Sequence, residues 1–299
     1  MMLAMSEASS KRGPAPACPG PDPSPHGPTR YRVPPGAVDT HAHVIGDPAR
    51  HPYVETRSFT APPATPAAYL GMLDATGMTH GVLVQVSVHG TDNHLLMETL
   101  RANRGRLKGI GVIELGHPDK VYRDLAGAGV VGLRLNVLYG GGMGLERIAD
   151  YGALCRELGW HLQLLIDART LPPIAARIAA LPVPVVVDHM GHFPTSAGVG
   201  DPGFQALVGL VRDGAWVKIS GAYRLTVEGP PYRDTIPFAH ALVAAAPERC
   251  VWGSDWPHVA HWKHMMNVGD LLDLLAYWVP NEATRRRVLV DNPARLYGF

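Results

Sequence analysis

The sequence predicts an α/β protein built as a single (β/α)8 barrel, or TIM barrel. Eight short apolar runs alternate with segments of helical character along most of the 299-residue chain. Polar residues suited to chemistry follow several of these runs, and a barrel carries its active site at that end of its strands. The main alternative is a doubly wound open sheet. It would need a glycine-rich phosphate loop after an early strand, and the sequence has none there.

The expected strands are short apolar runs separated by helical segments, a pattern that favours a parallel sheet. They cover residues 37–44, 80–88, 108–114, 130–137, 160–167, 182–190, 215–220 and 250–256.

The expected helices have capping residues or prolines at their starts and glycines at several of their ends. The segment 65–77, for example, opens on Thr and ends in Gly. The others cover residues 92–105, 146–159, 172–181, 202–214 and 233–247, and a closing helix is expected over 281–299.

Composition favours one large domain over residues 33–299, preceded by a flexible Pro-rich tail over residues 1–32. The net charge is +1, so neither nucleic acid nor a membrane surface is an expected partner. The opening residues lack the apolar core of a secretory signal. Cys18, Cys155 and Cys250 lie far apart, which argues against a disulfide framework and makes a cytoplasmic location the default. A monomer or a small homo-oligomer is expected.

Histidines at positions 41 and 43 end the first expected strand. Strand side chains alternate between faces, so His41 and His43 point the same way. Polar residues also end or follow five other expected strands, and their convergence on one barrel mouth predicts an active site. These residues are Ser87, His89, Arg134, Asn136, Asp188, His189, Ser220, Tyr223, Arg224, Asp255 and His258.

Asp255 is the expected general base, because it follows an apolar strand in a site that could exclude water. Its alternative role is a helix N-cap. His189 could instead bond the backbone, and Ser87 and His89 could close a turn. Arg134 lies in an otherwise apolar strand, where a buried charge needs a partner. We expect it to hold an anionic substrate bidentately rather than to pair with an internal acid.

Several motifs are similar to those of the amidohydrolase superfamily, in its amidohydrolase-related branch. They are DTHAHV, VVVDHMG, VKIS and VWGSDWPH. Within that branch the chain most resembles the 2-pyrone-4,6-dicarboxylate lactonase family, through VQVSVHGTDN (84–93), YRDTIPFA (232–239) and LVDNPARLY (289–297). The resemblance extends from about residue 38 to the C-terminus. The HxH pair is generic to the superfamily, whereas the combination of motifs is specific.

The resemblance implies that water opens a cyclic ester, in the catabolism of aromatic or related acids. It implies that Asp255 is the general base and that the carbonyl is oriented by His41, His43 and His189. It also implies that a small anionic or cyclic-ester substrate is contacted by Tyr53, Ser87, His89, Arg134, Arg224 and His258.

Three positions depart from the family pattern. The loop YGGGMG (139–144), Leu165 and Ala260 stand where the family has substrate-facing polar residues. An unpaired carboxylate in a dry pocket is costly. These departures therefore favour a lactone with one carboxylate, or with a larger apolar ring.

A site with two metal ions is not expected. The fourth strand offers Arg134 and Asn136 rather than a bridging carboxylate or modified lysine. The fifth has only His161, at the wrong end of the barrel for chemistry. A single zinc or manganese ion could bind His41, His43, His189 and Asp255.

We expect catalysis without a cofactor, because the resembled lactonase family works without metal and Arg134 would repel a cation. Two alternatives stay open, a metal-dependent decarboxylase of the same superfamily and a non-catalytic ligand-binding barrel.

Overall fold

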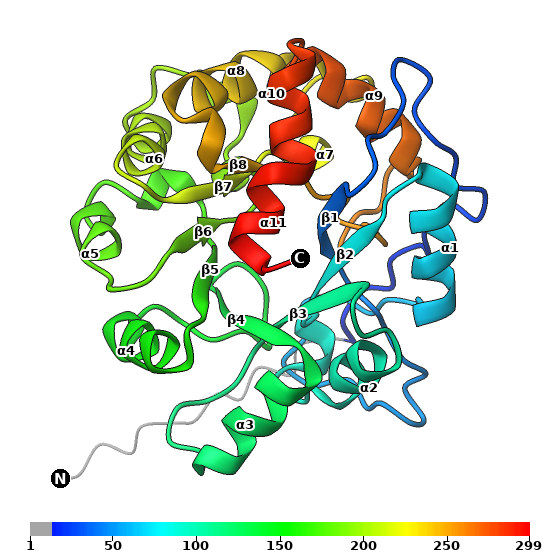
Figure 1. The fold of residues 1–299 in the computed structure, drawn as a ribbon, viewed down its shortest axis with the longest axis vertical. Coiled ribbons are helices and arrows are strands. Elements are labelled where there is room, and N and C mark those ends of the chain that lie inside the picture. Colours follow the sequence, from blue (N-terminus) through cyan, green and yellow to red (C-terminus); the bar gives the residue numbers. More distant parts are fainter. Residues whose placement is uncertain (1–13) are drawn as a thin grey trace, which may run out of the picture.

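The computed structural model describes residues 14–299, and in this part of the chain eight parallel strands follow one another in sequence order around a barrel (Figure 1). The strands are β1 Val38–Ala42, β2 His80–Val84, β3 Leu107–Gly111, β4 Val130–Asn136, β5 His161–Leu165, β6 Val185–Val187, β7 Trp216–Lys218 and β8 Cys250–Val251.

The barrel closes where the chain after β8 runs beside β1. The backbone N–H of Thr40 donates to the carbonyl of Trp252 (3.1 Å), and that of Asp255 donates to the carbonyl of His41 (2.8 Å). A parallel bridge joins Ala42 to Trp256. The predicted (β/α)8 barrel is therefore confirmed, and its closure sets Asp255 beside His41.

Helices surround the sheet (Figure 1). In residues 14–299 they are α1 Pro66–Thr76, α2 His94–Ala102, α3 Asp119–Ala128, α4 Ile148–Leu158, α5 Ala175–Ala179, α6 Pro202–Arg212, α7 Ala222–Leu225, α8 Ile236–Ala245, α9 Val268–Trp278, α10 Glu282–Arg286 and α11 Asn292–Tyr297. Between α10 and α11 the helix passes through a π-helical turn, Arg287–Asp291.

Local sequence explains where several of these helices begin or end. In α1, the Thr65 side chain accepts from the Ala68 N–H, Pro66 occupies the first turn, and Gly77 closes the helix with φ of 78°. In α6, Asp201 caps the start in the same way. The helices expected from these signals are present.

Three helices, α3, α7 and α9, were not expected. The first begins after Pro118 without a side-chain cap, and only its Tyr122, Leu125 and Ala128 face is buried. All eight strands are shorter than expected. The difference is largest for β6 and β8, which end before the polar residues that leave the ladder to face the site.

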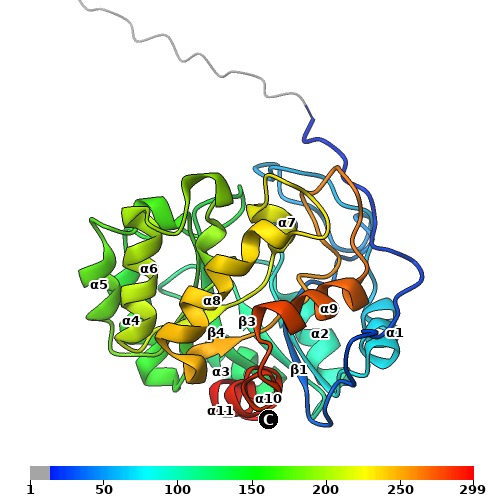
Figure 2. The ribbon, with the colours of Figure 1, turned by 90° about the horizontal axis from the view of Figure 1, so that it is seen from above.

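One end of the barrel is covered by α10 and α11 (Figure 2). There Tyr297 packs edge-on against His161, with ring centroids 5.2 Å apart, at the start of β5. The chemistry predicted at the strand ends must therefore lie at the opposite end, among the loops.

The described part of the expected N-terminal tail, residues 14–32, makes hydrogen bonds to the barrel. The Cys18 N–H donates to the Thr60 carbonyl (2.8 Å), and Thr29 and Arg30 donate to Asp273. The rest of that tail, residues 1–13, lies outside the described residues, and the boundary expected at residue 33 stays a prediction. Within the described chain, no helix has both the length and the apolarity needed to cross a bilayer.

Candidate active site

The loops at the end of the barrel opposite α10 and α11 surround a small cavity. Its empty volume, including space open to solvent, is about 310 Å³. Seven of the polar residues expected at the barrel mouth share this cavity with five others. It is lined by His43, Phe59, Val86, Ser87, Arg134, Asn136, Tyr139, Leu165, His189, Arg224, Asp255 and Val259.

Asp255 lies fully buried at the centre of the site. Its Oδ2 accepts from the Tyr223 hydroxyl (2.5 Å) and from Arg224 Nε (2.7 Å), whereas its Oδ1 has no hydrogen-bond partner. Burial would raise the pKa of this carboxyl, but the charge of Arg224 holds it well below its usual range. Asp255 is therefore ionised, with one oxygen free to accept a proton.

Three histidines surround this carboxylate. The Nε2 atoms of His41 and His43 lie 3.8 and 3.7 Å from Asp255 Oδ1, and that of His189 lies 3.7 Å from Oδ2. Burial lowers the pKa of His43 to about 4 and that of His189 to about 3, and holds that of His41 well below its usual value. All three rings are therefore neutral near pH 7.

The orientation of His43 follows from its other nitrogen. Nδ1 lies 2.8 Å from the Val84 carbonyl, which can only accept, so Nδ1 carries the proton and Nε2 carries a lone pair. That lone pair faces Asp255 Oδ1, another acceptor. Two acceptors 3.7 Å apart, both buried, form a place for a group that can donate to both or coordinate both.

Beneath the histidines lies a layer of buried charge. Asp188 accepts from Arg134 Nε (3.1 Å) and Gln163 Nε2 (3.0 Å). Lys218 Nζ lies 3.5 Å from Asp188 Oδ1 and 3.2 Å from His41 Nδ1, and donates to Gln163 Oε1 (2.8 Å). Burial lowers the Lys218 pKa to about 8 although Asp188 opposes this. The layer supports the His41 ring from below.

Sequence reasoning did not single out Lys218 or Gln163. The signal was available, since each is a lone polar residue within an apolar strand, as Arg134 is. Asp188 and Tyr223 were noted at strand ends without a role, and the structure gives both direct contacts with site residues.

The two expected arginines differ in what they contact. Arg134 pairs with an internal acid, Asp188, which was the less favoured expectation, yet it also lines the cavity. Arg224 donates three hydrogen bonds, from Nε to Asp255, from NH1 to the Tyr139 hydroxyl and from NH2 to the Val259 carbonyl. Arg134 is therefore the better placed of the two to meet a ligand, and its role as an anion holder stays a prediction.

Three of the residues expected to contact substrate do not line the cavity. The Tyr53 hydroxyl donates to the Ala61 carbonyl (2.9 Å), and His89 Nε2 accepts from the Gly46 N–H (3.2 Å), so both fasten the loop after β1. His258 is buried, packs edge-on against Tyr223, and has no hydrogen-bond partner at either ring nitrogen. Their contact with substrate stays a prediction.

Comparison with known proteins identifies the family. Residues 38–299 match the family described as amidohydrolase. The chain belongs to the amidohydrolase family. A 4-sulfomuconolactone hydrolase of Rhizobium radiobacter is 39% identical over 294 residues, covering 95% of this chain and 96% of that protein. A 2-pyrone-4,6-dicarboxylate hydrolase of Comamonas testosteroni is 32% identical over 287 residues, covering 90% and 92%.

A solved structure shares the fold of this amidohydrolase. It is a probable 2-pyrone-4,6-dicarboxylic acid hydrolase from Acinetobacter baumannii with citric acid bound. It has a TM-score of 0.80 and 28% identity, and the match covers 88% of this chain and all of that one. The family and its relatives establish this chain as an enzyme of the hydrolase type.

Amidohydrolases often use metal ions, and the residues of this site suit one. Ligand atoms of His41, His189 and Asp255 lie within 4.8 Å of one another. His41 Nε2 and Asp255 Oδ1 are buried without hydrogen-bond partners. Neutral histidines and a carboxylate form a typical zinc donor set. A bound divalent ion would polarise a carbonyl and activate water.

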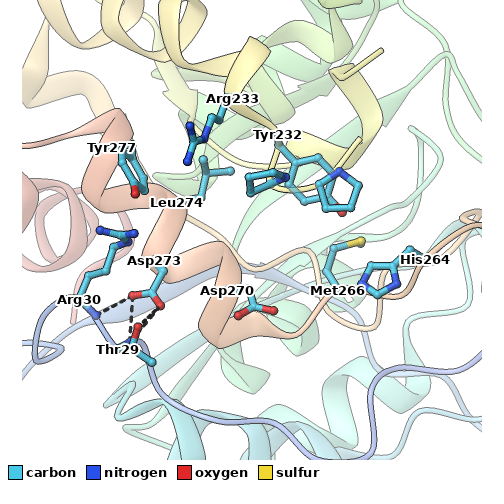
Figure 3. Close-up of a pocket in the computed structure, with 12 residues that line it drawn as sticks. Thr29, Arg30, Tyr232, Arg233, His264, Met266, Asp270, Asp273, Leu274 and Tyr277 are labelled. Atoms are coloured by element: carbon cyan, nitrogen blue, oxygen red, sulfur yellow. Dashed lines mark hydrogen bonds between the residues drawn. The ribbon is translucent and has the colours of Figure 1, made fainter. Parts of the chain in front are cut away.

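A second hollow lies on the outside of the barrel, away from these residues. Its empty volume is about 870 Å³, and it lies between the N-terminal segment, α9 and the loop before α8 (Figure 3). There the Asp273 carboxylate of α9 accepts hydrogen bonds from Thr29 and Arg30. None of the residues predicted for the active site lines this hollow.

Proposed function

We propose that this amidohydrolase opens a small anionic lactone by adding water to its ester carbonyl. The observation that carries the proposal is the pair of facing acceptors, Asp255 Oδ1 and His43 Nε2. A water molecule has two protons to donate, so it can bond both acceptors at once. This leaves its oxygen lone pairs directed away from them, toward a carbonyl carbon in the cavity.

The reaction then needs one proton acceptor and one carbonyl polariser. Asp255 takes a proton from water as the water oxygen bonds to the carbonyl carbon. The ring C–O bond then breaks, and Asp255 returns the proton to the leaving ring oxygen. The products are a hydroxyl and a carboxylic acid, which ionises in solution. His41 and His189, beside the same carboxylate, are proposed to orient the carbonyl.

The substrate is proposed to carry one acidic group bound by Arg134. Asp188 holds Nε of this guanidinium, which leaves the other two nitrogens for a carboxylate or sulfonate. Arg224 already has three partners. The remaining wall is largely apolar, from Phe59, Val86, Leu165 and Val259. Relatives named for sulfonated and carboxylated lactones support this class of substrate.

We also propose that hydrolysis needs no metal. Arg134 and Arg224 both line the cavity beside Asp255. Their charges would repel a divalent ion bound there, and this repulsion opposes its binding. A cytoplasmic location and a monomeric or small oligomeric state stay predictions from composition.

The test is a hydrolysis screen of small lactones bearing a carboxylate or a sulfonate, with metal content measured on the same sample. We expect ring opening without release of carbon dioxide, well under one metal per chain, and activity that survives dialysis against a strong chelator. Carbon dioxide release would favour the decarboxylase. Stoichiometric zinc or manganese, with activity lost on chelation and restored on re-addition, would reject the metal-free proposal.

A further inference from the structure

The N-terminal segment reaches the open end of the barrel. In Figure 2 the first described residues lie among the loops at the end opposite α10 and α11, and the chain then descends along the side past α9. We call residues 15–18 the strap. The strap contacts two loops, 57–62 after β1 and 259–262 after β8, and each contains a residue that lines the cavity.

On one side, the strap pairs with Thr60. The Cys18 N–H donates to the Thr60 carbonyl and the Thr60 N–H to the Pro16 carbonyl, both at 2.8 Å. The Thr60 hydroxyl donates to the Ala15 carbonyl at 2.9 Å. Thr60 directly follows Phe59, a buried residue of the cavity wall. These bonds therefore restrain one wall of the cavity.

On the other side, the strap holds the loop after β8. Trp262 is half exposed, and its indole Nε1 donates to the Ala17 carbonyl at 2.6 Å. The Cys18 thiol of the strap also lies beside the backbone of Ala260 in this loop. That backbone partly offsets the rise in the Cys18 pKa that burial causes. The same loop contains Val259, which lines the cavity and whose carbonyl accepts from Arg224 NH2.

We propose that the strap is a positioning element for substrate binding, which sets the spacing between Phe59 and Val259. This inference rests on the proposed lactone hydrolysis. The strap touches no reacting group. Its effect is exerted through two apolar side chains that would pack against the ring of the substrate. Loosening it should weaken binding of the ground state and the transition state alike, so KM should change and kcat should not.

Residues 24–30 of the same N-terminal segment provide a matched control. Asp273 of α9 accepts from Thr29 and Arg30 (Figure 3), and Asn267 contacts Ser24 and His26. These bonds also attach the segment to the barrel, but none of the residues that make them lines the cavity. Asp273→Ala therefore removes a comparable attachment without touching the strap.

The test compares the full-length double variant Thr60→Val/Trp262→Phe with Asp273→Ala and the parent. Each substitution in the double variant removes one side-chain donor to the strap and keeps most of the side-chain volume. We expect KM for an anionic lactone to rise roughly threefold to tenfold in the double variant, with kcat within about a factor of two, because two hydrogen bonds to the strap are lost. Thr60→Val also removes the bond that Thr60 Oγ1 accepts from Arg57 Nε (3.1 Å) within the same loop. Asp273→Ala should keep the parental KM. Equal KM values in all three proteins would overturn the proposal.

Amide hydrogen exchange separates this inference from the proposed reaction. In the double variant, exchange should accelerate in both loops, 57–62 and 259–262, and it should stay parental there in Asp273→Ala. This result does not depend on any substrate. If the parent hydrolyses no lactone, the proposed reaction fails while exchange still tests the strap. Unchanged exchange in both loops of the double variant would show that the strap does not restrain them.

Discussion

At the scale of single residues, Asp255 shows how one carboxylate can be held and still remain available. Tyr223 and Arg224 occupy Oδ2, and Oδ1 is left facing the His43 lone pair. The charge of Arg224 keeps the pKa low, so the base is ionised over the working range, although a low pKa also makes it a weak proton acceptor. Position rather than basicity therefore makes Asp255 effective.

Asp255→Asn tests this role. The amide keeps the size and the contact with Tyr223 but cannot accept a proton from water. We expect kcat to fall by about 10²–10⁴ with the fold retained, because that is the usual contribution of a general base. The measurement is the initial rate on the best lactone from the screen, with circular dichroism to verify folding. Turnover within about a factor of two of the parent would remove Asp255 from this role.

Arg134 has two candidate roles, and Arg134→Met separates them. If it holds a substrate anion, KM should rise sharply for an acidic lactone and much less for its methyl ester, which lacks the charge. If it only balances Asp188, both substrates should be affected equally, because the damage is then to the buried ion pair. Steady-state kinetics on the acid and ester pair distinguishes the two results.

At the scale of elements, the junction of β8 and β1 is the most demanding contact near the site. Gly253 lies so close to β1 that an added Cβ would meet His41 Cβ at 2.7 Å and His41 N at 2.8 Å. No ordinary side chain fits at those distances without moving the backbone. The absence of a side chain at position 253 therefore allows Asp255 and His41 to approach each other.

Gly253→Ala should accordingly destabilise the protein and reduce its activity. We expect a loss of about 1–3 kcal/mol in the free energy of unfolding from overpacking, together with a fall in kcat as His41 is displaced. Gly209→Ala in α6 is the control, since an added Cβ there meets nothing within 4 Å and alanine favours a helix. Urea unfolding and kinetics on both variants test this. Parental stability and activity in Gly253→Ala would show that the junction can relax.

At the scale of the whole molecule, buried histidines connect stability to pH. Burial, aided by the charge of Lys218, lowers the His161 pKa to about 3, and burial lowers those of His192 and His258 to about 4. In the unfolded chain these rings have a pKa near 6.5. Below that value the unfolded state binds protons that the folded state does not, so stability falls as pH falls.

We therefore expect full stability above about pH 6.5 and a loss of several kcal/mol in the free energy of unfolding by pH 5, at up to about 1.4 kcal/mol per pH unit for each buried histidine. Asp39 acts in the opposite direction over part of this range, because burial raises its pKa to about 6. Urea unfolding at pH 7.5 and 5.0 measures the difference. His161→Gln should reduce it, and equal stability at the two pH values would contradict the prediction.

The sequence by itself determined the barrel and most of the residues at its mouth. Apolar runs, caps and terminal glycines are local signals, and the spacing of His41 and His43 places both on one face of a strand whatever surrounds it. The ends of parallel strands must meet at one end of a barrel, so Asp255 and His189 could be expected beside them. Helix α3 was not predicted from the sequence because it has no side-chain N-cap and only one narrow face of it is buried.

Only the tertiary structure decided which hydrogen-bond and ion-pair partners the buried charged residues have. Arg134 and Asp188 are 54 positions apart, and Lys218 and His41 are 177 apart, so no local pattern could pair them. The same holds for residues 15–18, whose composition suggested a free tail and whose hydrogen bonds reach loops at both ends of the barrel sequence. A buried charge must find a counter-charge, but which one it finds depends on the order in which the closed barrel brings its strands together.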